Sequence, residues 1–385
     1  MQKVYSGLDG LDVSFQGHMP PSFLHCLARA KEEARESKKA VTISYKGFEF
    51  NVRGTGASGY SYIIDTGPDG EVWFFANSSK RDGWNMRVSV SSMGLALYGY
   101  KAIKERLWDR LEHFGAWVLD HSVARVDFAT DFVEPGFEPR AENVVAHWRM
   151  TQSEWRDTGE EGDGGGFHIV KQSGRVNSLT IGRMPGRQVI IYNKRREVID
   201  RRKVHWWSIW GLEDRKTPVW RIEVRAGKRE LKDRWKISTL ESLEAMLPEI
   251  LASILGDIRL VGDEQTDSNV TRQALHPCWV LAQEAAIKPM GEDLERPEPQ
   301  PIIAETQAAM KERYMSLAAG LTASLSVIQG IEGCEMPKAV GEALTASIAN
   351  HISRNKSKFM DSQKRAKKRL RFVTDASAWG MPLGA

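Results

Sequence analysis

The chain has 385 residues, of which 41% are hydrophobic, and its formal net charge is only +4. This length suits about two or three domains, and the weak overall charge alone does not indicate a nucleic-acid partner. No segment approaches the roughly 20 consecutive apolar residues of a membrane-spanning helix. The start, MQKVYSGLDG, lacks the apolar core of a signal peptide, so we expect a cytoplasmic protein without a membrane partner.

Short strand-like runs separated by turns fill the first hundred residues. They include AVTISYKGFEFNVRG and YSYIIDTGPDGEVWFFAN, and the second contains a Pro-Asp-Gly turn typical of a hairpin. From Leu95 to Phe114 apolar residues recur at helical spacing, and Gly115 follows as a plausible stop. We therefore expect residues 1–118 to be strand-rich, with one helix covering the strands.

Four later stretches also have the composition of strands. They are VARVDFATDF, NSLTIGR, RQVIIYNK and VWRIEVRAG, at residues 123–132, 177–183, 187–194 and 219–227. A glycine- and acid-rich loop, EEGDGGGFH, separates the first two, and a charged helical segment, KRREVIDRRKV, follows the third. We expect residues 119–265 to form one mixed or antiparallel sheet and the fold class to be α+β. No internal repeat is evident.

The pattern becomes helical from about Ser238. A segment rich in proline and charge, KPMGEDLERPEPQP, predicts a linker near residues 288–301. Residues 266–385 are therefore predicted to be a helical region that contains this linker and ends in the basic tail QKRAKKRLRF.

Positive charge is concentrated in two segments. Residues 193–236 hold 15 Lys and Arg against 7 Asp and Glu, and five tryptophans lie among them; residues 354–371 hold 9 basic residues against Asp361 alone. Clustered cations beside aromatic rings can neutralise phosphates and stack on unpaired bases. A merely solvated basic face and buried tryptophans are the alternatives. The candidate DNA-binding residues are Arg195, Arg196, Arg225, Lys364, Arg365, Lys367, Lys368 and Arg369.

Charged side chains share one face of two predicted strands, because alternate residues of a strand point the same way. They are Arg125, Asp127 and Asp131 on one strand and Arg221, Glu223 and Arg225 on the other. Oxygen ligands on adjacent strands favour a hard ion such as Mg²⁺ or Mn²⁺. Asp127 and Glu223 are the preferred ligands, and ordinary ion pairing with the neighbouring arginines is the alternative.

Tyr192 ends an apolar strand just before the charged helical segment. Its phenol has a reference pKa near 10, so attack on phosphorus would need nearby cations or a metal to stabilise the phenolate. Lys194, Arg195 and Arg196 follow closely in the sequence. The alternative is a tyrosine that only packs its ring at the end of a strand.

Several other kinds of site find no support. The nine histidines are scattered without an HExxH or His-hydrophobic-His pattern, and only His168 lies near the charged strands as a spare candidate. Cys26, Cys278 and Cys334 form no CxxC pair, which argues against a disulfide framework and a thiolate zinc site. Without a phosphate-binding loop, ATP use is not expected, and any helicase activity would come from a partner.

The strings VARVDFATDF, SLTIGR, VIIYNKRREV and WRIEVRAG, in this order, resemble the replication initiation factor family. That family comprises single-tyrosine rolling-circle initiators of small plasmids, related proteins of filamentous phages and relaxases of some integrative elements. The N-terminal string DGLDVSFQG also fits, so the resemblance spans roughly residues 7–260. The resemblance depends on the order and spacing of these strings taken together. The role of the region after Pro289 stays open.

The resemblance implies an Arg-x-Asp strand, a Tyr-x-Lys strand end followed by an acid, and an Arg-x-Glu strand. These fall on Arg125 and Asp127, on Tyr192, Lys194 and Glu197, and on Arg221 and Glu223. It thus implies Tyr192 as the nucleophile, assisted by Lys194 and Arg221. Asp131 and Glu197 join Asp127 and Glu223 as candidate metal ligands, although Glu197 could instead pair with Arg201 four residues on.

The function that this resemblance implies is rolling-circle initiation. Tyr192 would attack a phosphodiester in unpaired origin DNA, form a 5′-phosphotyrosyl link and release a 3′-hydroxyl. The expected partners are origin DNA, both double-stranded and unpaired, and a host helicase, with a homodimer left open. One alternative is a non-catalytic sequence-specific DNA-binding protein or repressor of the same fold. Another is a tyrosine recombinase, which needs no metal, with Tyr314 of KERYMSL as nucleophile.

Overall fold

The structure is a computed structural model of the chain. It describes residues 1–57, 59–77, 83–146, 167–172, 174–263, 272–290, 299–328, 330 and 337–374. The chain divides into two compact units, the first spanning Met1–Pro297 and the second Glu298–Trp379. The loop predicted at residues 160–168 lies outside the described residues except for Phe167 and His168, which begin a strand.

The first unit is built on one eleven-stranded sheet whose order is β2-β3-β4-β5-β6-β1-β7-β12-β11-β10-β9. Its strands are β1 (Gln2–His18), β2 (Val41–Tyr45), β3 (Phe48–Val52), β4 (Tyr62–Asp65), β5 (Glu71–Phe75), β6 (Trp84–Val90), β7 (Trp117–Val133), β9 (Phe167–Gln172), β10 (Arg175–Gly182), β11 (Arg187–Asn193) and β12 (Val219–Gly227). Each pairing in this sheet is antiparallel. β8 (Val144–Ala146) and β13 (Ile258–Leu260) form a separate two-stranded sheet.

Helices of the first unit begin and end at recognisable signals. They are α1 (Pro21–Ser37), α2 (Ser92–Phe114), α3 (Lys194–Asp200), α4 (His205–Trp210), α5 (Leu240–Asp257) and α6 (Pro277–Ala285), with a 3₁₀ turn at Ala141–Asn143 and a π-helical turn at Arg229–Arg234. The Ser91 side chain caps α2 by accepting a hydrogen bond from the Gly94 amide. Gly115 ends α2 in the left-handed conformation, at φ 76°, as a helix C-cap requires.

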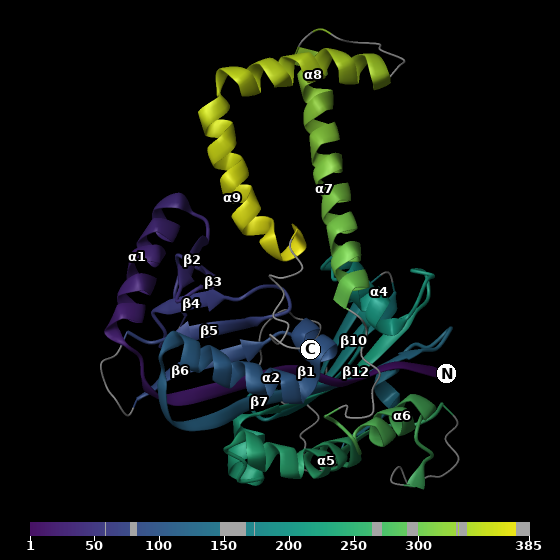
Figure 1. Cartoon of the computed structure of the whole chain (residues 1–385). Helices are drawn as coiled ribbons and strands as arrows, with labels where there is room; N and C mark the ends of the chain where they lie inside the picture. Colours follow the sequence, from purple (N-terminus) through teal and green to yellow (C-terminus); the bar gives the residue numbers. More distant parts are fainter. Residues whose placement is uncertain are drawn as a thin grey trace. The chain divides into compact units, whose positions relative to one another are not determined.

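The core lies between the sheet and the helices α1, α2, α5 and α6, whose apolar side chains join one continuous cluster. Figure 1 shows α5 and α6 running along one face of the sheet. Strand alternation places Val126 and Phe128 of β7 in this core, whereas Asp127 between them points the other way. The same alternation puts charged side chains of β12 on the face away from the core. The sheet therefore has one apolar face and one polar face.

Two halves of the sheet repeat one topology. A 17-residue strand starts each half, β1 in the first and β7 in the second, and these two pair antiparallel at the centre. The first half continues through the antiparallel meander β2–β6, and the second through the antiparallel meander β9–β12. The last strand of each meander lies beside the long strand, and a covering helix, α2 or α5, follows it. No repeat is evident in the sequence, so the two halves correspond in topology and not in obvious sequence similarity.

The second unit is helical. It contains α7 (Pro299–Ile328), α8 (Pro337–Arg354) and α9 (Lys356–Thr374), and α8 connects the other two (Figure 1). α7 begins at Pro299, inside the segment predicted as a linker, most of which lies outside the described residues. Among the described residues, no helix is both long and apolar enough to cross a membrane.

The predicted fold class is confirmed: the protein is α+β, with a large antiparallel sheet, covering helices and C-terminal helices. The four strands predicted in residues 119–265 belong to one sheet, and that sheet also includes the strands of the first hundred residues. Predicted bounds shift by a few residues, since β7 begins at Trp117 and α2 at Ser92.

Candidate active site

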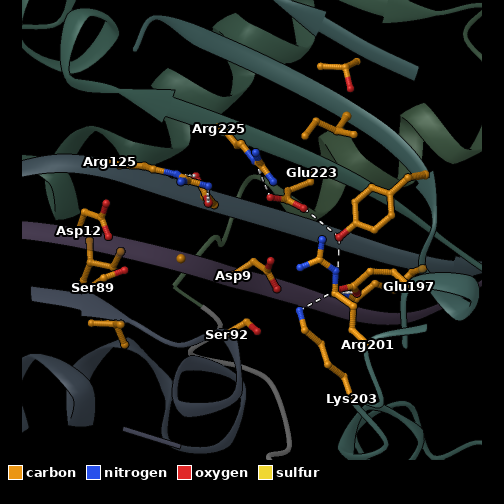
Figure 2. Close-up of a pocket in the computed structure, with 18 of the residues that line it drawn as sticks. Asp9, Asp12, Ser89, Ser92, Arg125, Glu197, Arg201, Lys203, Glu223 and Arg225 are labelled. Atoms are coloured by element: carbon orange, nitrogen blue, oxygen red, sulfur yellow. Dashed lines mark hydrogen bonds and ion pairs between the residues drawn. The ribbon is translucent and has the colours of Figure 1, made fainter. Parts of the chain in front are cut away.

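A polar pocket of about 470 Å³ opens on the polar face of the sheet (Figure 2). Side chains from β1, β6, β7, β10, β11, β12 and α3 line it. Five of them are carboxylates: Asp9, Asp12, Asp127, Glu197 and Glu223. The pocket lies where the two long central strands meet β12 and β11, so residues distant in the sequence share it.

Tyr192 lies next to the last residue of β11, in register with Arg221 of β12. Its hydroxyl donates a hydrogen bond to Glu223 Oε2 at 3.0 Å and accepts one from Lys194 Nζ at 3.4 Å. Loss of solvent raises the pKa of Tyr192 well above its ordinary value, although the Arg221 charge acts in the opposite direction. The phenol is therefore protonated at neutral pH, with a carboxylate placed to receive its proton.

Lys194 is the first residue of α3 and is 1% exposed. Asn193 caps this helix by accepting from the Arg196 amide at 2.9 Å, which fixes where the strand ends and the helix begins. The Lys194 ammonium forms an ion pair with Glu197 at 2.7 Å and lies 4.8 Å from the centre of the Trp206 ring. Burial lowers the pKa of Lys194, and the Arg221 charge lowers it further.

Glu197 faces the pocket from the first turn of α3. Its carboxylate contacts Lys194 and Lys203, each at 2.7 Å, and approaches Arg201 at 3.9 Å. Glu197 thus lines the pocket and also lies near Arg201, and its part as a metal ligand stays a prediction. Lys194 and Lys203 hold the pKa of Glu197 below its usual range despite partial burial.

Arg221 is completely buried and is held by two carboxylates. Asp131, in register with it on β7, accepts from Nε at 2.5 Å and from Nη2 at 2.7 Å. Asp9 of β1 accepts from Nη1 at 2.5 Å, and Trp210 of α4 donates to Asp131 at 2.7 Å. The Trp206 ring lies 4.3 Å from the guanidinium carbon. This arrangement fixes a permanent positive charge beside Tyr192.

The carboxylates that hold Arg221 respond to its charge. Burial alone would raise the pKa of Asp9, but Arg221 and Lys194 together lower it to about 2. Asp131 is fully buried and is not among the residues that line the pocket. Its oxygens are directed at Arg221 and Trp210. Its predicted part in metal binding stays a prediction, and the geometry shows it positioning Arg221.

Asp127 and Glu223, the preferred metal ligands, lie on adjacent strands and both line the pocket. Asp127 accepts from Arg125, and Glu223 Oε1 accepts from Arg225 at 2.7 Å. A Cβ on Gly10 of β1 would lie 2.8 Å from Asp127 Oδ2, so this glycine makes room for the carboxylate. Burial raises the pKa of Asp127 to about 7, opposed by Arg125 and reinforced by Glu223.

The donor set suits Mg²⁺ or Mn²⁺ in kind. Among the described residues, no group of three or more His, Cys, Asp or Glu side chains is arranged to hold a metal ion. Mg²⁺ is nevertheless often bound by one or two carboxylates together with waters and substrate phosphates. Asp127 and Glu223 are two such carboxylates on one polar face, so the residues fit an ion that is completed by the substrate.

The candidate DNA-binding residues are distributed over both units. Arg225 lines the pocket, whereas Arg195 donates to the Arg215 carbonyl and Arg196 pairs with Asp200. In the second unit, Lys364 and Lys367 of α9 are exposed. Arg365, Lys368 and Arg369 lie in the same helix, but their side chains are outside the described set. None of these positions tests DNA binding, which stays a prediction.

Two other sequence candidates are not among the residues that line the pocket. His168 lies on β9 in register with Thr180 of β10, and Tyr314 is exposed on α7. The tryptophans of the basic segment are mostly buried: Trp206, Trp207, Trp210 and Trp220 are at most 5% exposed. They pack inside the protein, which is the second of the two alternatives for that segment.

Sequence reasoning missed Asp9 and Trp210 as parts of the site. Asp9 belongs to the string DGLDVSFQG, which entered only through the family resemblance. The available signal was an acidic residue next to Gly10 in a predicted strand. Arg221, which pairs with Asp9, lies 212 residues later. Trp210 was considered only as a base-stacking or core residue.

Comparisons with known proteins found similarity among solved structures. No protein-family model matches the chain, and no curated protein matches it. Among solved structures, the rolling circle replication initiator protein from Geobacillus stearothermophilus is 14% identical, and the match covers 73% of this chain and 96% of that one at a TM-score of 0.40.

Proposed function

We propose that this protein nicks and rejoins one strand of DNA during rolling-circle initiation, with Tyr192 as the nucleophile. The observation that carries the proposal is the Tyr192 hydroxyl, held between Glu223 and Lys194 in a polar pocket beside the buried Arg221. The sequence resemblance supplies DNA and its origin as the substrate. Origin DNA would bind both as duplex and as unpaired strand, and a host helicase would separate the strands.

The reaction is a transesterification at phosphorus. The Tyr192 oxygen forms a bond to the phosphorus as the bond to the 3′ oxygen breaks, and the departing 3′ oxygen takes a proton from solvent. The products are a 5′-phosphotyrosyl link and a 3′-hydroxyl. Glu223 receives the phenolic proton, and the ammonium of Lys194 stabilises the developing phenolate. Arg221 contributes a fixed positive charge next to the attacking oxygen. Because the link conserves the energy of the phosphodiester, the 3′-hydroxyl can reverse the reaction without ATP.

Asp127 and Glu223 would hold Mg²⁺ or Mn²⁺, and Glu197 is a further candidate ligand. When bound, such an ion polarises phosphoryl oxygens and stabilises negative charge at the phosphorus. Arg125 and Arg225 form ion pairs with these two principal carboxylates. Binding of Mn²⁺ can be measured by calorimetry without DNA, and Asp127→Asn is expected to weaken it. Chelation that leaves nicking unchanged would remove the metal from this proposal.

The decisive experiment is a nicking assay on a supercoiled plasmid that carries the gene's own neighbourhood, with Mg²⁺ or Mn²⁺ present. The intact protein is expected to give relaxed circles and a covalent DNA–protein band. Tyr192→Phe should lose both, whereas the matched control Tyr314→Phe should keep both. The reverse result would favour the recombinase alternative. Tight, sequence-specific binding without any covalent band would identify a non-catalytic DNA-binding protein or repressor.

A further inference from the structure

The repeated topology gives Tyr192 a counterpart in the first half of the sheet. The hairpin β5–β6 corresponds to β11–β12, because each pair ends its meander next to a long central strand. Phe74 of β5 is in register with Arg87 of β6, just as Tyr192 of β11 is in register with Arg221 of β12. An aromatic side chain beside an arginine therefore recurs at the same place, but the first copy lacks the nucleophilic hydroxyl.

Phe74 belongs to a small cluster on the polar face of the sheet, formed with Tyr60 and Arg87. The Arg87 guanidinium carbon lies 5.4 Å from the centre of the Phe74 ring, and the Tyr60 ring centre lies 5.9 Å from it. Both rings are half-buried, and 38% of the Arg87 side chain is exposed. We call these three residues the aromatic cluster.

The aromatic cluster continues directly from the pocket. Arg87 Nη2 donates to Asp12 at 2.6 Å, and Asp12 lines the pocket. Ser89, two residues after Arg87 and on the same face of β6, also lines it (Figure 2). A strand leaving the pocket over β6 would therefore meet a cation first and the two rings next.

We propose that the aromatic cluster holds unpaired DNA beside the cleavage site by stacking bases on Phe74 and Tyr60, with Arg87 at the backbone phosphate. Continuity with the pocket and the pairing of rings with an exposed cation favour this occupant, since such platforms bind single strands with little sequence preference. The inference rests on the proposed function, because it requires DNA in the pocket. In this arrangement the first half keeps the shape of the catalytic half and binds without cleaving.

The test measures binding of labelled oligothymidylate by fluorescence anisotropy, using full-length protein that carries Tyr192→Phe to prevent covalent capture. Phe74→Leu keeps an apolar side chain of similar reach but removes the ring, and is expected to weaken binding about tenfold, as the loss of one stacked base would. Phe74→Tyr restores a ring and should bind like the parent. Val72→Ala, on the same face of the same strand, is the matched control and should leave affinity unchanged.

Thermal unfolding of each variant separates loss of binding from loss of fold. A Phe74→Leu protein that unfolds at the parent temperature and binds about tenfold more weakly supports the inference. If Phe74→Leu binds as tightly as the parent, the aromatic cluster has no such role. The proposed function still stands in that case, provided that the unmodified protein, with Tyr192 intact, nicks the plasmid. If the parent binds no oligothymidylate and the protein with Tyr192 intact forms no covalent band, the proposed function fails and the inference with it.

Discussion

Arg221 lies beside the Tyr192 hydroxyl because Asp9 and Asp131 hold its guanidinium from two different strands. Asp9→Asn replaces a charged acceptor with a neutral one and should allow Arg221 to move. Loss of one charge-assisted hydrogen bond is worth roughly 1.5–3 kcal/mol, so we expect single-turnover adduct formation at saturating DNA to slow about 10- to 100-fold. DNA affinity should change little, because Asp9 contacts Arg221 and is not required to contact DNA.

Asp12→Asn is the control for this substitution. Asp12 lines the same pocket from the same strand, but its carboxylate pairs with Arg87. Adduct formation at saturating DNA should therefore stay near the level of the unmodified protein. Equal slowing in both variants would show that pocket charge in general matters, and not the hold on Arg221.

Asp9 also gives the fold a pH dependence with a defined sign. Its pKa is about 2 in the folded protein, against about 3.9 in an unfolded chain. A lowered carboxyl pKa stabilises the fold above the unfolded pKa, and this contribution is lost as pH falls from about 4 toward 2. The free energy of unfolding of the unmodified protein should exceed that of Asp9→Asn by on the order of 2 kcal/mol at pH 6.

The difference should shrink steadily below pH 4. Urea unfolding at pH 6, 4 and 3, followed by tryptophan fluorescence, measures it. A difference that persists undiminished at pH 3 would mean that the Asp9 contribution comes from packing and not from its ionised carboxylate.

The sequence predicted those site residues whose placement depends only on their neighbours in the chain. Strand alternation alone placed Asp127 and Glu223 on polar faces, because the direction of a side chain depends on its immediate neighbours. The hold on Arg221 is non-local: Asp9 lies 212 residues from Arg221, and Trp210 lies 79 residues from Asp131. No spacing rule connects such residues. The family resemblance indicated the role of Tyr192, and the spacing of residues alone did not.

At the scale of single elements, α4 shows how a short helix supports the site. It has six residues, His205–Trp210, too few to be stable alone, so its stability comes from packing. Trp206, Trp207 and Trp210 are buried with Val198 and Val219 in a second apolar cluster. The Trp210 indole also donates to Asp131. α4 therefore fixes the carboxylate that fixes Arg221.

Trp210→Phe keeps an aromatic ring in the cluster but removes the donor to Asp131. A buried acceptor that loses its donor costs roughly 1–3 kcal/mol, so the free energy of unfolding should fall by about that amount. Trp207→Phe is the control. It removes a similar volume from the same helix and the same cluster, but it leaves in place the hydrogen bond that Trp210 donates to Asp131. Urea unfolding should show the larger loss for Trp210→Phe. Equal losses would mean that ring volume, and not the hydrogen bond, is responsible.

Individual strands and helices were predictable, but their assembly into one sheet was not. Composition marked the strand VWRIEVRAG with the bounds that the structure has, because alternation and β-branched residues are local signals. The central pairing joins Leu11 to Val126 across more than a hundred residues, which local patterns do not report. The repeat was hidden because its two halves share topology and register but few residue identities, as Phe74 and Tyr192 illustrate.

At the scale of the whole molecule, the two units divide the predicted DNA contacts. The first unit contains the pocket, which combines five carboxylates with cations, and so has no simple positive field. The second unit ends in α9, whose exposed Lys364 and Lys367 belong to the strongly basic segment. We therefore expect the first unit to orient the scissile strand and α9 to supply affinity for the backbone of duplex DNA.

That division predicts a specific salt dependence. On B-DNA, each phosphate contact lowers the slope of log affinity against log salt by about 0.9 through counterion release. If Lys364 and Lys367 both contact phosphates, Lys364→Gln/Lys367→Gln should reduce the magnitude of this slope by about 2 for origin duplex. Anisotropy titrations between about 50 and 200 mM salt measure this slope. The rate of adduct formation on a saturating single-stranded oligonucleotide should be unaffected.

Lys38→Gln/Lys39→Gln provides the matched control, because these exposed lysines at the end of α1 carry the same charge and do not line the pocket. Loss of general electrostatic attraction would affect the two double variants equally, since each removes two positive charges. Contact with phosphates predicts a reduced slope for the α9 variant alone, because only groups that displace counterions from DNA enter the slope. Equal slopes in the two variants would remove α9 from the proposed DNA-binding surface.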